Sequence, residues 1–402
     1  MHVLHVTPYF PPTWAYGGIP RIVDGLSRAL ADQSVDVTVL TTDAFDGTRR
    51  SDEAGERMHH GVRVLTLSNV SNRLAYRHQL FVPRGGREAM AKLDHHHPID
   101  LVHMHGHRHL LNNIALRWVG ARARDNRVVP VVFTSNGTLL RHERKVGVKL
   151  LWDLAVAGHV PGAADACIAV SAADVAAHRQ AGIPAERIHR IPNGLDLAEF
   201  SPLPERGRFR RAHNLGNGPL VVFLGQVSPR KGVEHLVQAF RGGGPEGATL
   251  VIAGNDMGGM ATARAQADGA VHFVGLLEGP ARLELLADAD VLVYAGKTEI
   301  FGLVPFEGLL CGAPVVVADD CGCGEIIREA GAGLLVKHGD VEGIRARIRT
   351  LLRDRVAASA MVRRGRRYIE AHLGFGVVAA RHRELYATLC RSSPPRGPPV
   401  PS

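Results

Sequence analysis

The fold is decided by the beginning of the chain, where residues 2–40 read HVLHVTPYFPPTWAYGGIPRIVDGLSRALADQSVDVTVL. The apolar run over 3–7 is typical of a β-strand, and residues 8–18 are rich in the loop formers proline and glycine. Apolar side chains then recur at helical spacing over 19–30, and residues 35–40 are strand-like again. A strand, a helix and a strand in so short a span form a βαβ unit, which predicts a parallel sheet with right-handed crossovers.

The same alternation continues along the chain with one interruption. Strand candidates before it lie at 62–67, 101–104, 128–134 and 166–170, and those after it lie at 220–224, 249–253, 270–274, 291–294, 314–317 and 333–336. The interruption consists of the turn sequence Ile191-Pro-Asn-Gly-Leu-Asp196 and an arginine-rich, proline-spaced segment over 200–219. The predicted fold class is therefore α/β, with two successive doubly wound domains and a ligand-binding cleft between them.

The domain boundaries follow from these patterns. We place an N-terminal Rossmann-like domain at 1–196 and a C-terminal one at 197–375. A final helix over 376–391 is expected to pack back on the N-terminal domain. The tail over 392–402 is rich in proline and serine and is expected to be disordered. A length of 402 residues also favours two cores over one.

The composition is that of an ordinary globular protein, with 45% hydrophobic and 22% charged residues. The formal net charge of +9 indicates anionic partners such as nucleotides or phospholipid headgroups, unless the excess arginines are merely scattered over the surface. The longest basic cluster, Arg363-Arg-Gly-Arg-Arg367, has no aromatic partner pattern for base stacking. We therefore expect no nucleic-acid partner.

Cysteine usage and hydropathy bear on the compartment. The five cysteines are odd in number, and Cys321 and Cys323 are the one close pair, without a second pair at zinc-finger spacing. Reduced thiols in the cytoplasm are the simplest interpretation. The sequence shows no signal-peptide pattern and no run of about 18 apolar residues, so we expect no spanning helix.

The most informative segment is Glu299-Ile-Phe-Gly-Leu-Val-Pro-Phe-Glu307, which follows a hydrophobic strand. Pro305 is tolerated in the first turn of a helix and Gly312 suits a helix end, so a short helix is predicted from about 303 to 311. The backbone N–H groups around Gly302 and Leu303 would begin that helix and could bind a phosphate. The two glutamates could reach different ends of one ligand; the alternative is that they merely favour the helix dipole.

A second motif is Gly225-Gln-Val-Ser-Pro-Arg230-Lys231-Gly232, which also follows a strand. It carries two adjacent cations at the opening of a helix. A planar guanidinium beside a compact ammonium suits the two phosphates of one diphosphate. The alternative interpretation is a solvated basic turn.

In combination these motifs resemble the family-4 retaining glycosyltransferases of GT-B fold, also called group 1 glycosyl transferases. The resemblance covers about residues 1–390 and includes the junction sequence over 191–196. It implies that Arg230 and Lys231 hold the donor diphosphate, that Glu299 binds hydroxyls of the donor sugar, and that Glu307 binds the ribose. The implied donor-binding set is Gly17, Gly18, Gly225, Arg230, Lys231, Glu299, Phe301, Gly302, Leu303 and Glu307.

The N-terminal domain carries further matches. Gly17-Gly18 resembles the family's glycine loop near the donor phosphate, where a Cβ would obstruct the backbone, although a simple turn is the alternative. His105 matches the family's active-site histidine, and His103 lies on the same face of the same strand. Since further histidines lie nearby in the sequence, a surface cluster or a metal site is the competing interpretation. Asn136 stands where many relatives carry histidine, so it can hydrogen-bond but not transfer a proton.

The resemblance implies a reaction and its catalytic residues, His105, Glu299, Lys231 and Arg230. Attack from the front face would retain the anomeric configuration, with the leaving phosphate taking the proton of the acceptor. No cofactor and no metal ion are expected. The one Asp-x-Asp, Asp288-Ala-Asp290, precedes a strand and would lie at the wrong end of the sheet to hold a metal in the cleft. On the acceptor side we expect His103 and Asn136.

The predicted function is the transfer of a hexose from a nucleotide-diphosphate sugar to a glycan or lipid-linked acceptor, in cell-surface polysaccharide or glycoconjugate synthesis. Three alternatives stay open: a sugar-nucleotide epimerase of the same fold, a glycoside hydrolase using Glu299 and Glu307, and a non-catalytic binding module or nucleic-acid binder. The stretch over 141–152 mixes cations with apolar residues, which indicates docking on an anionic membrane or a helix packed by its apolar side. Contacts to the donor base are expected in the loops over 254–259 and 275–278.

Overall fold

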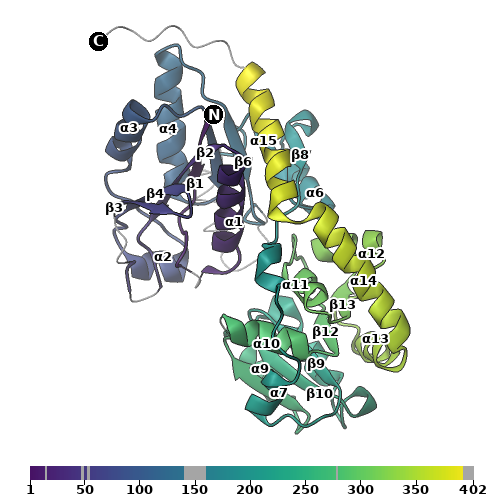
Figure 1. Cartoon of the computed structure of the whole chain (residues 1–402). Helices are drawn as coiled ribbons and strands as arrows, with labels where there is room; N and C mark the ends of the chain where they lie inside the picture. Colours follow the sequence, from purple (N-terminus) through teal and green to yellow (C-terminus); the bar gives the residue numbers. More distant parts are fainter. Residues whose placement is uncertain (14–15, 47–48, 52–54, 140–159, 278, 393–402) are drawn as a thin grey trace. The chain divides into compact units, whose positions relative to one another are not determined.

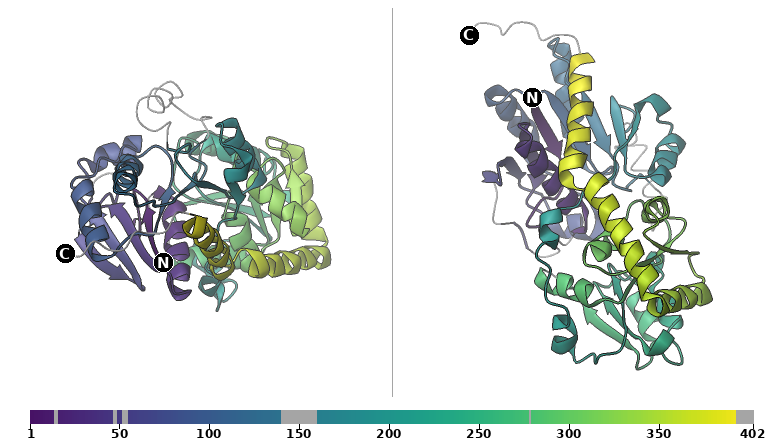
Figure 2. Two further views of the ribbon diagram at one scale, coloured as in Figure 1. Left: turned by 90° about the horizontal axis from the view of Figure 1, so that it is seen from above. Right: turned by 45° about the vertical axis from the view of Figure 1, so that its right-hand side comes forward.

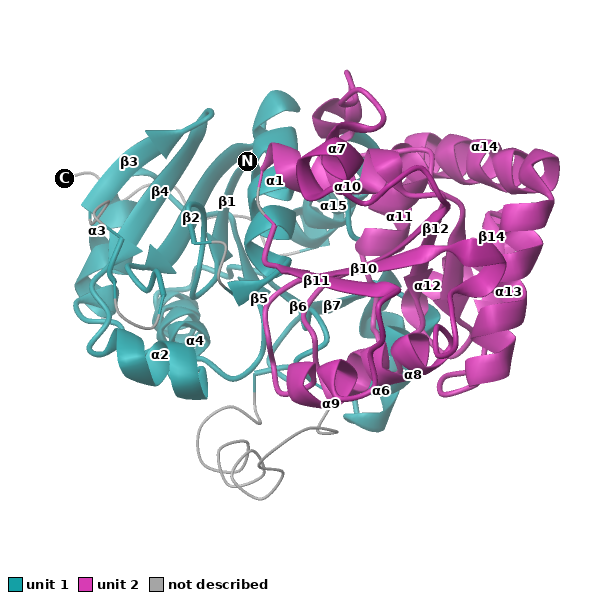
Figure 3. Ribbon diagram, turned by 90° about the horizontal axis from the view of Figure 1, so that it is seen from below, with its two compact units in different colours: residues 1–195, 375–402 teal, residues 196–374 magenta. Residues whose placement is uncertain are grey.

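The computed structural model describes residues 1–402 except 14–15, 47–48, 52–54, 140–159, 278 and 393–402. It divides into two compact units, which Figure 3 colours separately. Unit 1 comprises residues 1–195 and 375–402, and unit 2 comprises residues 196–374. The basic segment over 141–152 and the tail from 393 onward lie outside the described residues.

Unit 1 is built on an eight-stranded sheet of spatial order β3-β4-β2-β1-β5-β6-β7-β8 (Figure 1). Its strands are β1 (His2–Val6), β2 (Asp36–Thr42), β3 (Gly55–His59), β4 (Val62–Leu67), β5 (Leu101–His105), β6 (Val131–Thr134), β7 (Ala166–Ala169) and β8 (Ile188–Arg190). The pairings are parallel except that of β3 with β4. Because the winding reverses between β1 and β5, their C-terminal ends flank the switch point where such sheets bind ligands.

The sequence patterns do not predict two edge strands. Strand β3 has the polar sequence GERMH and is largely exposed, and β8 is only three residues long. Neither contains the buried apolar run by which the other strands were predicted. Strand β6 is also shorter than predicted because Pro130, which has no N–H for the ladder, directly precedes it.

Helices surround the sheet of unit 1, and the last of them comes from the far end of the chain. They are α1 (Ile19–Asp32), α2 (Asn72–His78), α3 (Gly86–His96), α4 (Leu110–Arg124), α6 (Ala172–Gln180) and α15 (Phe375–Ser392). Helix α15 packs beside α1, as the two views of Figure 2 also show. A Cβ would lie 2.0 Å from the ring of Phe375 if built on Gly25, and 2.2 Å from it if built on Gly194. The start of α15 can therefore pack here only because both positions lack a side chain.

Unit 2 contains a six-stranded parallel sheet of order β11-β10-β9-β12-β13-β14. Its strands are β9 (Leu220–Leu224), β10 (Thr249–Ala253), β11 (Val271–Gly275), β12 (Val291–Tyr294), β13 (Val315–Ala318) and β14 (Gly333–Val336). This is the 3-2-1-4-5-6 order of a doubly wound dinucleotide fold, with its switch point between β9 and β12. The predicted α/β class with two doubly wound sheets is therefore confirmed.

The helices of unit 2 are α7 (Arg208–His213), α8 (Val233–Gln238), α9 (Met260–Arg264), α10 (Pro280–Asp288), α11 (Val304–Leu310), α12 (Gly322–Ala330), α13 (Val341–Arg353) and α14 (Arg355–His372). Helix α11 lies where Pro305 and Gly312 predicted a short helix. No helix in the described ranges has both the length and the apolar character that crossing a bilayer requires.

The Asp-x-Asp pair lies at the N-terminal end of β12, as predicted, and both carboxylates have partners in unit 2. That of Asp288 accepts hydrogen bonds from the backbone N–H groups of Gly207 and Arg210. Asp290 forms ion pairs of 2.6 Å with Arg206, Arg210 and Arg355. It also accepts a hydrogen bond of 2.8 Å from the backbone N–H of Leu220, which joins the starts of β9 and β12. The pair thus holds the sheet together at the end opposite to the switch point.

Candidate functional site

The switch point of unit 2 brings the two sequence motifs together. Lys231 ends the 3₁₀ turn Pro229–Lys231 that follows β9, and Glu299 lies in the loop after β12. The Nζ atom of Lys231 donates to the carboxylate of Glu299 and to the hydroxyl of Tyr294. The Tyr294 hydroxyl in turn donates to Oε2 of Glu299 at 2.8 Å. Arg230 completes the cluster, with its Nη1 at 4.0 Å from Oε1 of Glu299.

Most of this cluster is shielded from solvent, and its charges affect one another. Lys231 and Tyr294 are 8% and 4% exposed, whereas the side chain of Arg230 is 31% exposed. Burial alone would raise the pKa of the Glu299 carboxyl, but the charges of Lys231 and Arg230, with hydrogen bonds from Lys231 and Tyr294, leave that pKa below its ordinary value. Burial raises the pKa of the Tyr294 hydroxyl well above its ordinary value. At neutral pH Glu299 is therefore a carboxylate and Tyr294 a neutral phenol.

The glycine of the Glu299 motif is packed closely. Gly302 has a φ of 72°, and a Cβ there would lie 3.1 Å from both the sulfur of Cys323 and the ring of Tyr294. Any other side chain would therefore disturb the wall of the cluster. Phe301 is 4% exposed and its ring packs on Phe306 at 5.3 Å, which places it in the core.

Gly225 lies in the loop after β9 and has a φ of 142°. Its N–H donates to the carbonyl of Ala253 at 3.0 Å, so it links the ends of β9 and β10. A Cβ on the neighbouring Gly254 would lie 1.8 Å from the carbonyl oxygen of Gly225. The close approach of these two loops thus depends on both glycines.

The second glutamate of the motif has a partner that the sequence did not point to. Glu307 lies in α11 and is 6% exposed. Its Oε2 forms an ion pair of 2.7 Å with Nη1 of Arg282, which is itself buried in α10. Arg282 also pairs with Glu199, so one guanidinium joins two carboxylates. The structure thus gives Glu299 and Glu307 different cationic partners.

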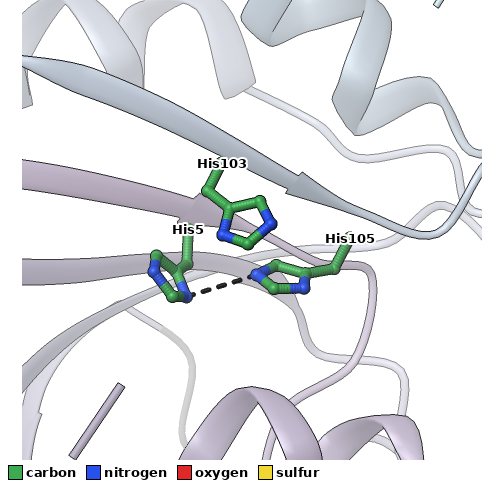
Figure 4. Close-up of side chains that lie close together, drawn as sticks. All are labelled: His5, His103 and His105. Atoms are coloured by element: carbon green, nitrogen blue, oxygen red, sulfur yellow. Dashed lines mark hydrogen bonds between the residues drawn. The ribbon is translucent and has the colours of Figure 1, made fainter. Parts of the chain in front are cut away.

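In unit 1 the predicted histidines meet beside the first switch point. His105 ends β5, and its Nε2 lies 3.3 Å from Nδ1 of His5 in β1 (Figure 4). His103 exchanges hydrogen bonds of 2.6 Å with the hydroxyl of Tyr386 and 2.7 Å with that of Thr134. Burial lowers the pKa of His5 to about 3 and holds the pKa of His103 and His105 well below the ordinary value. All three imidazoles are therefore uncharged at neutral pH.

A small pocket in unit 1 lies against His105. Its polar lining consists of His105, Thr134, Asn193 and His382, and the rest of its wall is mostly apolar. His382 belongs to α15, and its Nδ1 is hydrogen-bonded to the carbonyl of Val378 at 2.8 Å. Burial lowers the pKa of His382 to about 4, so it too is neutral. The sequence patterns did not single out His382 or Tyr386, and they gave Asn193 only as part of the junction sequence over 191–196.

The remaining candidates of unit 1 lie in loops at strand ends. Gly17 has a φ of 95°, and Gly18 caps α1 and accepts the first helical hydrogen bond from Ile22 at 3.1 Å. Asn136 follows β6 in a left-handed conformation, with a φ of 49°. Its side-chain amide is buried without a hydrogen-bond partner among the described residues.

Two family models match the chain on either side of its predicted domain junction. The model described as Glycosyltransferase Family 4 matches residues 16–199, and the model described as Glycosyl transferases group 1 matches residues 205–368.

Related proteins agree with these matches. A GDP-mannose-dependent alpha-mannosyltransferase of Mycolicibacterium smegmatis is 30% identical over 331 residues, which cover 80% of either chain. A protein of the same description from Mycobacterium tuberculosis is 33% identical over 185 residues, which span 46% of this chain and 47% of that relative. The solved structure of sucrose-phosphate synthase from Thermosynechococcus elongatus shares the fold, with a TM-score of 0.74 at 22% identity over 98% of this chain and 100% of that one. The chain therefore belongs to the family-4 glycosyltransferases, the group 1 glycosyl transferases of GT-B fold that its motifs resemble.

Proposed function

We propose that this glycosyltransferase is a retaining, metal-independent hexosyltransferase, which transfers a hexose from a nucleotide-diphosphate sugar to a glycan or lipid-linked acceptor. The observation that carries the proposal is the cluster of Lys231, Arg230, Glu299 and Tyr294 at the switch point of unit 2, of which Arg230 is the most exposed member. This cluster supports the proposal because the positive charge of Lys231 and Arg230 suits a diphosphate, and the ionised carboxylate beside them can accept hydrogen bonds from sugar hydroxyls.

The protein contributes to this reaction mainly by stabilising charge and by positioning the substrates. The bond between the anomeric carbon and the phosphate oxygen breaks, and its electron pair goes to the nucleoside diphosphate. The acceptor oxygen forms a new bond to the anomeric carbon on the same face, and its proton passes to the leaving phosphate. Arg230 and Lys231 stabilise the negative charge that develops on the diphosphate. Glu299 orients the sugar, which removes part of the entropic cost of the encounter.

The names of the relatives give a first candidate for the donor. Two related proteins are described as GDP-mannose-dependent, so GDP-mannose is the donor to test first. We propose that the unit 1 residues His105 and Asn136 contact the acceptor. A role in cell-surface polysaccharide or glycoconjugate synthesis is part of the proposal. Activity at the cytoplasmic face of a membrane stays a prediction. The segment over 141–152, on which that prediction rests, lies outside the described residues.

The proposal is tested by incubating the full chain with GDP-mannose, UDP-glucose and other nucleotide sugars, with and without oligosaccharide acceptors. Release of free nucleoside diphosphate is followed. We expect one donor to be consumed, faster with an acceptor, and Glu299→Gln to abolish most of the release. Glu329→Gln, at an exposed position in α12, is the matched control and should behave as the unmodified chain.

The alternatives give different products in the same assay. An epimerase releases a free epimer of the sugar whether or not an acceptor is present. A hydrolase cleaves glycosides that carry no diphosphate. A non-catalytic binding protein retains the donor unchanged. Absence of nucleoside diphosphate release from every donor would contradict the proposed transfer.

A further inference from the structure

His5, His103 and His105 form a compact group of metal-ligating side chains on one face of the unit 1 sheet. His5 and His103 are paired neighbours in the register of β1 and β5, and His105 follows His103 by two residues on the same strand face. Figure 4 shows the three rings turned toward one another. Within the described ranges of the chain, this is the one group of three or more potential ligands with donor atoms close enough to share an ion.

The spacing of the ring nitrogens suits a tetrahedral metal. One nitrogen from each ring can be chosen so that all three lie within 4.8 Å of one another. The His105 Nε2 and His5 Nδ1 atoms are already 3.3 Å apart. Two ligands at about 2.0–2.1 Å from a tetrahedral zinc ion stand about 3.3 Å apart, so this pair has ligand spacing before any ion binds.

The group is closed to bulk solvent, because the exposed fraction is 0% for His5 and His103 and 1% for His105. A histidine binds a metal through a ring-nitrogen lone pair. An ion among these rings would therefore have imidazole nitrogens as its protein ligands and little competition from bulk water.

Hydroxyl groups around the site can orient a liganding ring. His103 is hydrogen-bonded through Nδ1 to Tyr386 and through Nε2 to Thr134. When one nitrogen of a histidine binds a metal, the other ordinarily donates to an oxygen that fixes the ring. One of these two bonds can therefore be kept while the metal replaces the other.

The ligand chemistry selects the class of ion. The group offers only imidazole nitrogens, which suit Zn²⁺, Cu²⁺, Ni²⁺ and Co²⁺ and not the oxygen-seeking Mg²⁺ or Ca²⁺. A fourth imidazole, that of His382, stands 5.9 Å from His103 between ring centroids. The pocket against His105 and His382 gives an ion a place to approach the group.

We propose that His5, His103 and His105 bind one divalent transition-metal ion, with Zn²⁺ the best match, and that the bound ion inhibits glycosyl transfer by occupying His105. The binding stands on the geometry alone. The inhibition rests on the proposed function.

The binding is tested with cobalt as a spectroscopic probe. The full chain, without a polyhistidine tag, is freed of metals with EDTA and titrated with Co²⁺, whose visible absorption is intense in four-coordinate sites and weak in six-coordinate ones. We expect one equivalent of Co²⁺ to produce the intense band and one equivalent of Zn²⁺ to remove it. The variants His5→Gln and His105→Gln should lose the band. A control variant, His95→Gln/His96→Gln, removes two exposed neighbouring histidines and should keep it.

Two further measurements keep the proposal falsifiable. Tyr386→Phe and Thr134→Val each leave every ligand in place, and one of the two should weaken Co²⁺ binding about tenfold, the usual effect of losing an orienting partner. X-ray absorption of the zinc-loaded, unmodified chain should show nitrogen neighbours and no sulfur. No intense band, a band that survives in a folded His5→Gln variant, or sulfur neighbours would each overturn the site.

The inhibition is measured separately, as nucleoside diphosphate release with and without one equivalent of Zn²⁺. We expect at least a tenfold loss of turnover in the unmodified chain that EDTA restores. Full turnover with the site loaded would overturn the inhibitory role. A chain that binds Co²⁺ but turns over no donor would instead contradict the proposed function and leave the metal site standing.

Discussion

Lys231 and Glu299 are 68 residues apart in the chain, and the Nζ atom of the first donates directly to the carboxylate of the second. Two parallel strands make this possible, because β9 and β12 are neighbours and their following loops leave the sheet on either side of the switch point. In this proposal the donor replaces the partners of the ion pair. The ammonium of Lys231 can pair with an incoming diphosphate, and the carboxylate of Glu299 can then accept hydrogen bonds from sugar hydroxyls.

The Tyr294 hydroxyl is the neutral member of this cluster. It donates to Glu299 at 2.8 Å and accepts from Lys231, so it orients both ions. We expect Tyr294→Phe to lower kcat/KM roughly tenfold, the scale of losing a hydrogen bond to a charged group. Steady-state kinetics with the preferred donor measures this effect. An unchanged kcat/KM would show that the phenol only fills space.

The pH dependence of activity should report the pairing of Glu299 with Lys231. Among the groups that lower the pKa of the buried Glu299 carboxyl, the charge of Lys231 is the largest. Replacing it by methionine removes that charge, so the pKa rises and the carboxylate is protonated at a higher pH. The acidic limb of the pH profile of kcat/KM should therefore move to higher pH in Lys231→Met. Lys92→Met, at an exposed position in α3, should leave the limb in place.

The Arg282–Glu307 pair should be important for the stability of unit 2. Both side chains are buried, with side-chain exposures of 6% and 8%. Arg282→Met would leave the carboxylate of Glu307 without this partner, and breaking a buried pair in this way costs about 3–5 kcal/mol of unfolding free energy. Urea denaturation measures the loss.

A matched control for that experiment is the surface pair of Arg353 and Glu246. Arg353 is 70% exposed in this pair, so Arg353→Met should cost less than about 1 kcal/mol. Equal losses in the two variants would contradict the structural role of Arg282.

The buried histidines should make unit 1 sensitive to mild acid. The pKa of His5 is lowered from 6.5 to about 3, and that of His382 from 6.5 to about 4, because burial disfavours the charged form. Their contribution to stability is therefore complete above pH 6.5 and is lost as the pH falls from 6.5 toward these lowered values. Each such group can contribute a slope of up to about 1.4 kcal/mol per pH unit.

The measurement is the urea midpoint of unfolding as a function of pH. We expect it to fall between neutral pH and about pH 5 in the unmodified chain, and to fall less steeply in His382→Gln. His95→Gln, at an exposed position, should keep the full slope. A midpoint that does not change with pH would contradict the burial of neutral imidazoles.

Much of the architecture could be predicted from local patterns. The strands that carry the two sheets are buried apolar runs, and proline and glycine mark where they end, so β1, β5, β9 and β12 were located to within two residues. The proximity of Lys231 to Glu299 also follows from sequence, since both lie after strands in a doubly wound pattern.

What could not be predicted depends on contacts between distant segments. Tyr294 reads as the last residue of an apolar strand, and nothing in that strand reveals its hydrogen bond to Glu299. In the sequence nothing distinguishes Arg282 from the other arginines. Its pairing with Glu307 becomes visible only when α10 is packed beside α11. His382 and Tyr386 reach the histidines of unit 1 only because α15 returns to pack on α1, which is a tertiary event.

The most direct test of the central claim compares turnover of the preferred donor in four chains. These are the unmodified chain, Glu299→Ala, Lys231→Ala and the surface control Lys92→Ala, each first checked for native folding by circular dichroism. If the Lys231–Glu299 cluster holds the donor, both site variants should release nucleoside diphosphate at least ~100-fold more slowly, the scale of losing an electrostatic stabiliser, while Lys92→Ala stays unchanged. Near-normal turnover in both site variants would contradict the account.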